Sequence, residues 1–218
     1  SKTGTDDLLM QLQGSIPSLN VHLQPISDAA SMIRPANLRG LSADSTLITT
    51  NGKRRHHASV IAFQGGGVND GSQGADISVI PAIALKRVEV LRDGASAQYG
   101  SDAIAGVINF VLDDISEGGS LSYKMGEYTE GDGATTTIAG KYGLPLGQDG
   151  FVTTSFQIRQ ADDTSRSLQR PDAAALIAAG NTAVANPAQV WGAPKIDDDV
   201  TFFMNAGVTN SDGSESYM

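Results

Sequence analysis

The chain has 218 residues, enough for one large domain or two smaller ones, and its hydrophobic content of 40% is ordinary for a folded protein. It contains 25 glycines and no cysteine, which excludes a disulfide framework, a thiolate metal site and a thiol nucleophile. Residues 1–112 carry nine basic and nine acidic residues, whereas residues 113–218 carry six and fifteen, so the net charge of −9 lies in the second half. This asymmetry indicates two regions in different surroundings and argues against a nucleic-acid partner.

Short elements are predicted in the first third of the chain. Acidic residues precede Leu8, Leu9 and Leu12, which share one helical face, so residues 6–13 favour a short helix that Gly14 would end. Three further segments favour strands, and the pair Asn51-Gly52 predicts a turn after the third. These segments are residues 16–23, residues 32–41, which Pro35 interrupts, and residues 45–50.

A glycine-rich segment and three apolar segments follow. Residues 64–76 contain five glycines in thirteen positions, which predicts an exposed, mobile loop. The pattern then predicts a strand over Leu85–Leu91, a helical turn over Ala95–Tyr99 and a strand over Ala105–Leu112. The last of these is almost continuously apolar, which favours burial on both of its faces.

The pattern changes after Asp114. Four segments of about ten residues alternate apolar side chains with small or polar ones, and residues 215–218 would open a fifth. The segments contain residues 121–125, 137–142, 152–159 and 200–208. This period is typical of outer-membrane barrel strands, which face lipid on one side and the lumen on the other, and equally of a soluble antiparallel sandwich.

The connections between these segments differ in length. Residues 144–150 predict a tight turn with proline and glycine, whereas residues 162–199 form a connection of 38 residues that contains one tryptophan. Short turns at one rim and long loops at the other are typical of a membrane barrel.

Three motifs between residues 38 and 112 resemble the plug domain of TonB-dependent outer-membrane receptors, in that family's order and spacing. They are Leu38-Arg39-Gly40-Leu41, the strand and turn from Leu47 to Arg54, and Arg87–Arg92 followed by Tyr99–Asn109. Residues 16–21 add a weaker match to the plug's first strand. The chain departs from the family pattern at Asp93-Gly94-Ala95, where many members have Gly-Pro-Ala, and at Thr49 and Thr50, which replace aliphatic residues.

The resemblance implies a fold in two parts. Residues 1–114 would form an α+β plug domain, a small mixed sheet with short helices. Residues 115–218 would be the first antiparallel β-strands of a truncated transmembrane β-barrel, since such transporters have about 22 strands. The chain is therefore expected to be an N-terminal fragment, with any TonB box lying before Ser1.

The same resemblance implies a transport function at the cell outer membrane of a Gram-negative bacterium, and no enzyme activity. In this family the plug closes the barrel, a small-molecule, sugar or peptide substrate binds from outside, and TonB supplies the energy that opens the path. TonB and outer-membrane lipid are the implied partners, and no cofactor, metal or nucleic acid is implied. The alternative is a surface-signalling or adhesion receptor with the same fold.

Candidate functional residues follow from the resemblance. Arg39, Glu89 and Arg92 are expected to form ion pairs with one another or with carboxylates of the lumen, because charges in an enclosed lumen need partners. Residues 129–134 and 162–199 are the expected external barrel loops, with Tyr128 and Trp191 as candidates for stacking on a sugar or lying at the membrane interface. The substrate-facing plug candidates are residues 27–32 together with Gln64, Gly65, Gly66, Gly67, Asn69, Asp70 and Gln73.

Other motifs suggest chemistry that their spacing does not favour. The run Arg54-Arg55-His56-His57 offers metal or anion ligands, but adjacent residues of a strand point to opposite faces. Gly94–Gln98 resembles a nucleophile elbow, yet it ends in glutamine and no histidine follows it. The glycines at 65–67 lack the lysine of a phosphate loop, and Asp70–Asp76 and Asp197–Asp199 lack the ligand spacing of an EF-hand.

Overall fold

The computed structural model describes residues 8–21, 33–62, 67–92, 95–164, 167–189, 192–193, 195–209 and 215–217. Several of the predicted positions lie outside these ranges. They are residues 27–32, Gln64, Gly65, Gly66, Asp93-Gly94 and Trp191.

A four-stranded mixed sheet forms the centre of the first half of the chain. Its strands are β3 (Thr46–Thr50), β4 (Lys53–Arg54), β5 (Leu85–Leu91) and β6 (Gly106–Leu112). Their order is β4-β3-β6-β5, with β3 parallel to β6 and the outer two strands antiparallel to their neighbours. The strand predictions for 45–50, 85–91 and 105–112 are confirmed. Strand β4, only two residues long, was not predicted, because two residues carry no periodic signal.

Short elements surround this sheet. Helix α1 (Leu8–Ser15) runs one residue past Gly14, so the prediction that Gly14 ends the helix is wrong by one residue. Strands β1 (Leu19–Val21) and β2 (Ala36–Leu38) pair antiparallel, and helix α2 (Ala95–Tyr99) has the predicted bounds. Among the described residues, these elements are connected by the 3₁₀ turns η2 (Ala43–Ser45), η3 (Gly67–Asn69), η4 (Ala82–Ala84) and η5 (Ser101–Ala103).

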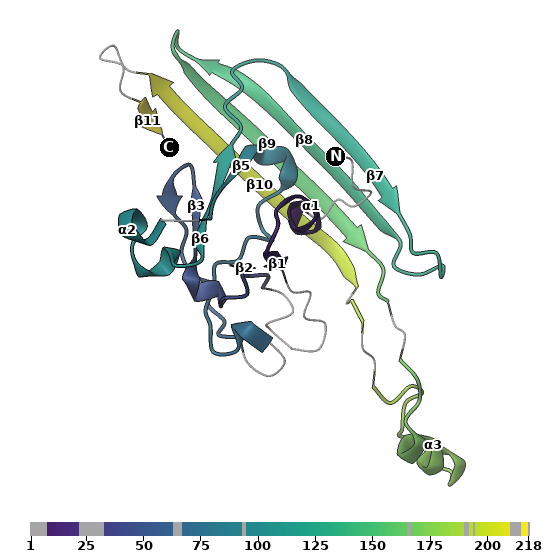
Figure 1. The fold of residues 1–218 in the computed structure, drawn as a ribbon. Coiled ribbons are helices and arrows are strands. Elements are labelled where there is room, and N and C mark those ends of the chain that lie inside the picture. Colours follow the sequence, from purple (N-terminus) through teal and green to yellow (C-terminus); the bar gives the residue numbers. More distant parts are fainter. Residues whose placement is uncertain are drawn as a thin grey trace.

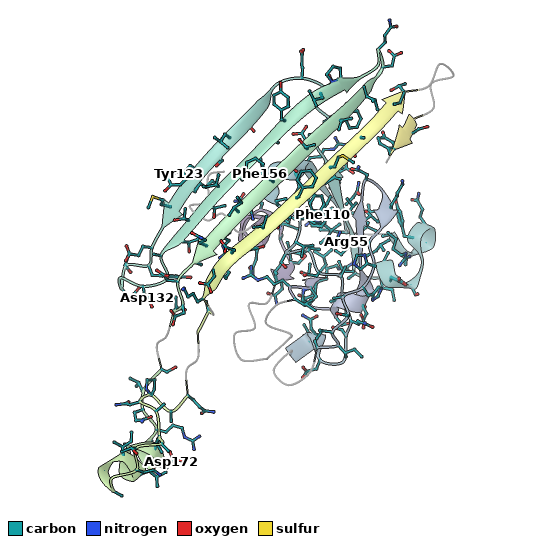
Figure 2. All side chains as sticks on the ribbon, turned by 180° about the vertical axis from the view of Figure 1, so that it is seen from behind. Arg55, Phe110, Tyr123, Asp132, Phe156 and Asp172 are labelled. Carbon is teal, nitrogen blue, oxygen red and sulfur yellow. The ribbon has the colours of Figure 1, made fainter. Side chains whose placement is uncertain are left out.

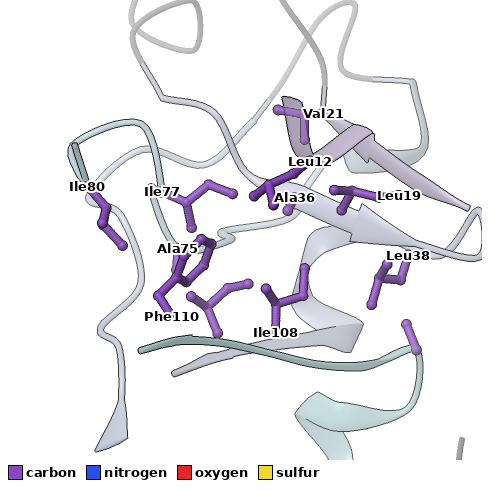
Figure 3. Close-up of a cluster of buried hydrophobic side chains, with 12 residues drawn as sticks. Leu12, Leu19, Val21, Ala36, Leu38, Ala75, Ile77, Ile80, Ile108 and Phe110 are labelled. Atoms are coloured by element: carbon purple, nitrogen blue, oxygen red, sulfur yellow. The ribbon is translucent and has the colours of Figure 1, made fainter. Parts of the chain in front are cut away.

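One apolar core joins these elements (Figure 3). Ile108 and Phe110 of β6 are fully buried, and they pack with Leu38 of β2 and Ile77 and Ile80 of the segment before η4. On the opposite face of the sheet a smaller cluster contains Leu47, Ala95, Ala103 and Val107. Burial of β6 on both faces confirms the expectation drawn from its continuous apolar sequence.

The second half of the chain forms a five-stranded antiparallel sheet, with the first half packed against one side of it (Figure 1). Its order is β11-β10-β9-β8-β7, so every strand neighbours the next along the chain. The strands are β7 (Gly119–Gly126), β8 (Thr135–Leu146), β9 (Gly150–Ala161), β10 (Ile196–Thr209) and β11 (Glu215–Tyr217). The four alternating segments predicted after Asp114, and the start of a fifth, are therefore strands.

Connections of different length lie at the two ends of this sheet. Residues 127–134 and 162–195 join strands at one end, here called the α3 end. Residues 147–149 join β8 to β9 at the other, the turn end, where β10 ends and β11 begins. Helix α3 (Pro171–Ala178) lies beyond the strands at the α3 end (Figure 1). The alternation of long and short connections follows the pattern expected for a barrel.

Two predicted boundaries in this region are wrong. Strand β8 continues through Pro145, where a turn was predicted. At this position β8 pairs only with β9, because β7 begins at Gly119, which lies opposite Tyr142. A proline is tolerated where one side of the strand has no ladder partner. Asp197–Asp199, assigned to the long connection, already belong to β10, which has a register irregularity between Ile196 and Asp199.

The two faces of the five-stranded sheet differ in character. The face away from the first half carries a row of exposed apolar side chains, including Tyr123 and Phe156 (Figure 2). Its other large apolar members are Leu121, Met125, Ile138, Tyr142, Leu144, Leu146, Ile158, Val200, Phe202, Met204 and Val208. The alternate positions, such as Thr137, Thr153, Ser155 and Asn205, are polar and buried towards the first half. An apolar outer face and a polar inner face are the arrangement of a membrane barrel wall.

Candidate functional site: the contact between the plug and the strand wall

A polar cluster fixes the end of β6 to the inner face of the five-stranded sheet. The Asp113 carboxylate, with its side chain 9% exposed, forms an ion pair with the Lys141 ammonium of β8, whose side chain is 22% exposed. The main-chain oxygen of Asp113 accepts a hydrogen bond from Nδ2 of Asn205 on β10 at 2.9 Å. Asp113 is thus tied to two strands of the wall at once.

Asn51 links the turn after β3 to the same cluster. Its Nδ2 donates to Oδ1 of Asn205 at 3.2 Å, and its Oδ1 accepts the main-chain N–H of Leu112 at 2.8 Å. The φ angles of Asn51 and Gly52 are 49° and 74°, as a two-residue turn of the primed type requires. Asparagine is among the few residues other than glycine that enter this left-handed region readily. The predicted turn is confirmed, and its first residue also reaches the wall.

The connection between β6 and β7 lies flat on the wall. Thr153 of β9 donates its hydroxyl hydrogen to the main-chain oxygen of Ile115 at 2.8 Å. Gly143 of β8 lies directly beneath, and a β-carbon there would overlap the main chain of Ile115. Asp114 turns the other way and pairs with Lys86 of β5 at 2.8 Å. The connection is therefore anchored on both sides, to the wall and to the four-stranded sheet.

Apolar contacts accompany the polar ones. Phe203 of β10 points inwards and packs against the core of the first half, although it belongs to the wall. The turn η4 lies against β8 and β9, two adjacent strands of the wall. Burying apolar surface in this way stabilises the contact by roughly 25 cal/mol for each square ångström removed from water.

Glu89 lies in a hydrogen-bonded network across three strands of the four-stranded sheet. Its carboxylate accepts hydrogen bonds from Nε of Arg87 at 2.6 Å and from Nδ2 of Asn109 at 2.9 Å. Oδ1 of Asn109 in turn accepts from the Thr49 hydroxyl and from the main-chain N–H of Gly52, both at 2.9 Å. The Asn109 hydrogen bond, and after it the Arg87 guanidinium, hold the pKa of Glu89 below its ordinary value.

The structure places the three predicted ion-pair residues in two groups. Glu89 forms its ion pair with Arg87, which was not among the candidates. Arg39 reaches Arg92 instead, since Nη1 of Arg39 donates to the main-chain oxygen of Arg92 at 3.2 Å. Arg39 follows β2 and Arg92 follows β5, so this contact closes one end of the sheet. The mechanical role of the three residues stays a prediction.

The basic run that begins at the last residue of β4 makes contacts within the first half. Arg54 forms an ion pair with Asp102, whose pKa is lowered chiefly by the Ser101 hydroxyl and also by Arg54. Arg55 donates from Nε to the main-chain oxygen of Asp76 at 3.1 Å, and His57 contacts the main-chain oxygen of Gln73 through Nδ1. Within the described ranges, no group of three His, Asp or Glu side chains is arranged to hold a metal ion.

The part of the glycine-rich loop that the structure describes is not uniformly exposed. Asn69 is fully buried, and its Oδ1 accepts the main-chain N–H of Ala43 at 3.0 Å. Gln73 donates from its main-chain N–H to Asp44 at 2.9 Å and from Nε2 to the main-chain oxygen of Ala58 at 2.7 Å. Asn69 is thus a support of the loop and cannot face a substrate, whereas Gly67 and Asp70 are exposed as expected.

The connections at the α3 end carry the other candidates. Tyr128 lies in the connection between β7 and β8 and is 59% exposed. In the long connection, Gln169 holds the segment around α3 together, since its Nε2 donates to the main-chain oxygen of Ala185 at 3.0 Å and its Oε1 accepts the N–H of Ala188 at 2.8 Å. Arg170 pairs with Asp172 in the first turn of α3 and lowers the pKa of that carboxyl. This part of the long connection is folded, which its composition did not predict.

A wall with an apolar outer face and a polar inner face, filled from inside by a separate folded unit, is the architecture of a plugged outer-membrane barrel receptor. None of the helices in the described parts of the chain has the length and apolar character that would let it cross a membrane. Residues 1–107 match the sequence model of the family described as TonB-dependent Receptor Plug Domain. The first half of the chain is therefore assigned to the plug domain of TonB-dependent receptors.

The first of two similar solved structures agrees with this fold. The chain is similar to the ferric enterobactin receptor PfeA in complex with BCV-L6, with a TM-score of 0.58 and 24% identity, over 77% of this chain and 24% of that chain. It is also similar to the siderophore receptor PirA from Pseudomonas aeruginosa, with a TM-score of 0.41 and 22% identity, over 67% of this chain and 29% of that one. The chain spans about a quarter of the length of the PfeA chain it matches.

Proposed function

We propose that this receptor imports an extracellular substrate into the periplasm with energy from TonB. Residues 1–114 would be the plug that closes the pore, and residues 115–218 would be the first strands of the barrel. The observation that carries the proposal is the packing of the plug against the polar inner face of a sheet whose outer face is an apolar band. A plug on the inside of such a wall blocks passage until it moves.

The substrate would enter at the α3 end. The long connections lie there, and so does the segment η3 of the plug (Figure 1). Exposed plug residues such as Gly67 and Asp70 would then face the incoming substrate, together with Tyr128 and Trp191 from the wall's connections. A tyrosine that is mostly exposed at a rim offers a ring face for stacking and a hydroxyl for hydrogen bonding.

Energy would be needed because the plug is held by several independent contacts. The Asp113–Lys141 ion pair, the Asn51–Asn205 hydrogen bond and the Phe203 contact must be loosened, or bypassed, before a path opens. Arg39, Glu89 and Arg92 would add contacts on the other side of the plug, to carboxylates of the lumen. A pull on the plug through TonB supplies work that substrate binding alone does not.

The test is an uptake assay with the full-length receptor in Gram-negative cells that lack their own receptors of this class. Cells are given a ferric catecholate, a ferric hydroxamate, cobalamin or a maltooligosaccharide, with and without TonB. We expect one of these probes to accumulate at least tenfold more when both receptor and TonB are present. Equal accumulation of that probe with and without TonB would contradict the proposal.

Two tyrosines of similar exposure provide a matched pair of variants for the binding step. Tyr128 lies in a connection at the α3 end, and Tyr123 lies on the apolar outer face of β7, where it is 61% exposed. Tyr128→Ala should weaken binding of the accumulated probe severalfold, whereas Tyr123→Ala should leave it unchanged. If Tyr123→Ala weakened binding and Tyr128→Ala did not, the α3 end would not be the side at which the substrate enters.

A further inference from the structure

We use the word seam for the boundary between two hydrogen-bonded neighbouring strands of the wall. Each seam contains a glycine directly opposite an aromatic residue. Gly119 of β7 faces Tyr142 of β8, and Gly140 of β8 faces Phe156 of β9. Gly207 of β10 faces two aromatics, Phe151 of β9 and Tyr217 of β11. The four seams from β7 to β11 are thus marked in the same way.

In every pair the aromatic ring lies over its glycine. A β-carbon placed on Gly140 would lie 2.6 Å from Cε1 of Phe156, and one placed on Gly119 would lie 2.8 Å from Cδ2 of Tyr142. A β-carbon on Gly207 would lie 2.8 Å from Cε1 of Phe151 and 3.1 Å from Cδ1 of Tyr217. Real β-carbons do not approach other atoms to 2.8 Å, so these rings occupy space that only glycine leaves free.

The alternation of apolar and polar residues does not by itself select this register. A slip of one residue would turn the apolar set towards the plug and is strongly disfavoured. A slip of two residues keeps every side chain on its own face, so the alternation tolerates it. Long antiparallel strands with a uniform apolar face therefore need a second signal to pair in one way.

The glycine–aromatic pairs distinguish the observed register from one that is shifted by two residues. A two-residue slip between β8 and β9 would move Phe156 from Gly140 to a position opposite Ile138 or Tyr142, as the register of these strands shows. Both of those residues carry side chains on the outer face, where the ring now lies. The ring would lose the flat surface over the glycine and would have to compete for the same space.

We propose that these cross-strand glycine–aromatic pairs set the register of the wall strands when the barrel assembles, with Gly140 and Phe156 as the positioning pair of the β8–β9 seam. The ring covers the bare main chain of the glycine, and the glycine admits the ring, so the pair is satisfied only in one register. The assignment concerns assembly and does not depend on which substrate the receptor takes.

The experiment is a disulfide assay of strand register in the full-length receptor, and it benefits from the absence of cysteine in these 218 residues. The native reporter is Thr136→Cys with Gln160→Cys, which are register partners. The reporter of a two-residue slip is Thr136→Cys with Ile158→Cys. Directly opposed strand positions bring the α-carbons within bridging distance, so oxidation yield reports the register.

In the wild-type background the native reporter should oxidise at least tenfold more than the slip reporter. Phe156→Ala removes the ring without introducing a clash and should lower this ratio at least fivefold. Gly140→Val should do the same, and the exchange Gly140→Phe with Phe156→Gly should restore the ratio to within about twofold of wild type. Gly126→Val is the control, because a β-carbon on Gly126 meets no atom within 4 Å.

The outcome that overturns the proposal is a ratio that stays at the wild-type value in Phe156→Ala. If Gly140→Val yields no inserted protein, Phe156→Ala and the exchanged pair decide the question on their own. A ratio that falls in Phe156→Ala but is not restored by the exchange would also contradict it, since a general loss of packing would then explain the result.

Discussion

Asn51 and Asn205 are 154 positions apart in the sequence, and Nδ2 of the first donates a hydrogen bond to Oδ1 of the second at 3.2 Å. Asn205 is 6% exposed, and it also donates to the main-chain oxygen of Asp113 at 2.9 Å. The buried amide of Asn205 on the wall therefore accepts a hydrogen bond from the turn after β3 and donates one to the end of β6. It connects the two parts of the plug sheet that run parallel to each other.

Removing this amide should loosen the plug. In Asn205→Ala the buried oxygen of Asp113 and the amide hydrogens of Asn51 lose their partner, which costs about 1–3 kcal/mol. We expect the urea midpoint for loss of plug protection against protease to fall in the detergent-solubilised full-length receptor. Gln157→Ala, on the same inner face of the wall, is the comparison. Equal urea midpoints for Asn205→Ala and wild type would show that the hydrogen bonds of Asn205 do not hold the plug in place.

The ion pair between Asp113 and Lys141 should show strong coupling in a double-mutant cycle. Lys141→Met leaves the nearly buried Asp113 carboxylate without its cation, and losing one partner of a buried pair costs about 3–5 kcal/mol. Asp113→Asn should destabilise as well, and the double variant should be more stable than the sum of the single effects predicts. The measurement is the free energy of unfolding of the plug, and additive effects would argue against a direct pair.

The stability contributed by Glu89 should depend on pH. Its folded-state pKa is lowered from the ordinary value of 4.5 by Asn109 and Arg87, so the folded plug favours the ionised carboxylate. The stability difference between wild type and Glu89→Gln should be fully present above pH 4.5 and lost as pH falls through the lowered pKa. Urea unfolding at pH 7, 5 and 3.5 tests this. A difference that grew on acidification would have the wrong sign.

Much of the plug was predictable because its signals are local. The β-branched and apolar runs of β3, β5 and β6 specify strands wherever they occur, and the Asn51-Gly52 pair specifies a turn by its backbone preferences. The alternation after Asp114 specified the wall strands in the same way. What stayed open was whether their apolar face meets lipid or a second sheet, because the period is the same for both.

The contacts between plug and wall were not predicted, although their residues carried a weak signal. Lys141, Thr153 and Asn205 occupy positions of the strands that alternate with the large apolar residues, so they could be assigned to the inner face. Nothing in the sequence pairs Lys141 with Asp113, or Asn205 with Asn51, since those contacts depend on how two domains dock. Arg87 was missed as the partner of Glu89 although the sequence carried that signal, because residues two apart in one strand share a face.

Within the glycine-rich loop, Asn69 and Asp70 should behave differently despite being neighbours. Asn69 is fully buried and accepts the N–H of Ala43, so Asn69→Ala should destabilise the loop by about 1–3 kcal/mol. Hydrogen exchange at Ala43 should then accelerate roughly tenfold or more. Asp70→Ala changes an exposed side chain and should leave that exchange rate within about twofold. If exchange at Ala43 were faster in Asp70→Ala and unchanged in Asn69→Ala, then Asp70, and not Asn69, would be the residue that supports the loop.

The apolar band of the wall gives opposite expectations for two adjacent residues of β10. Phe202 belongs to the outer row and is 66% exposed, whereas Thr201 alternates with it and faces the plug side. An arginine on the lipid face of a barrel costs about 2–4 kcal/mol near the middle of the bilayer. Phe202→Arg should therefore lower the yield of heat-modifiable barrel in the membrane, while Thr201→Arg should reduce it less, because its side chain can reach the water and carboxylates of the lumen. If the two substitutions reduced the yield equally, or Thr201→Arg reduced it more, the outer face would not be the one in contact with lipid. The polar cluster around Asp113 would then lie on the wrong side of the wall for a plug.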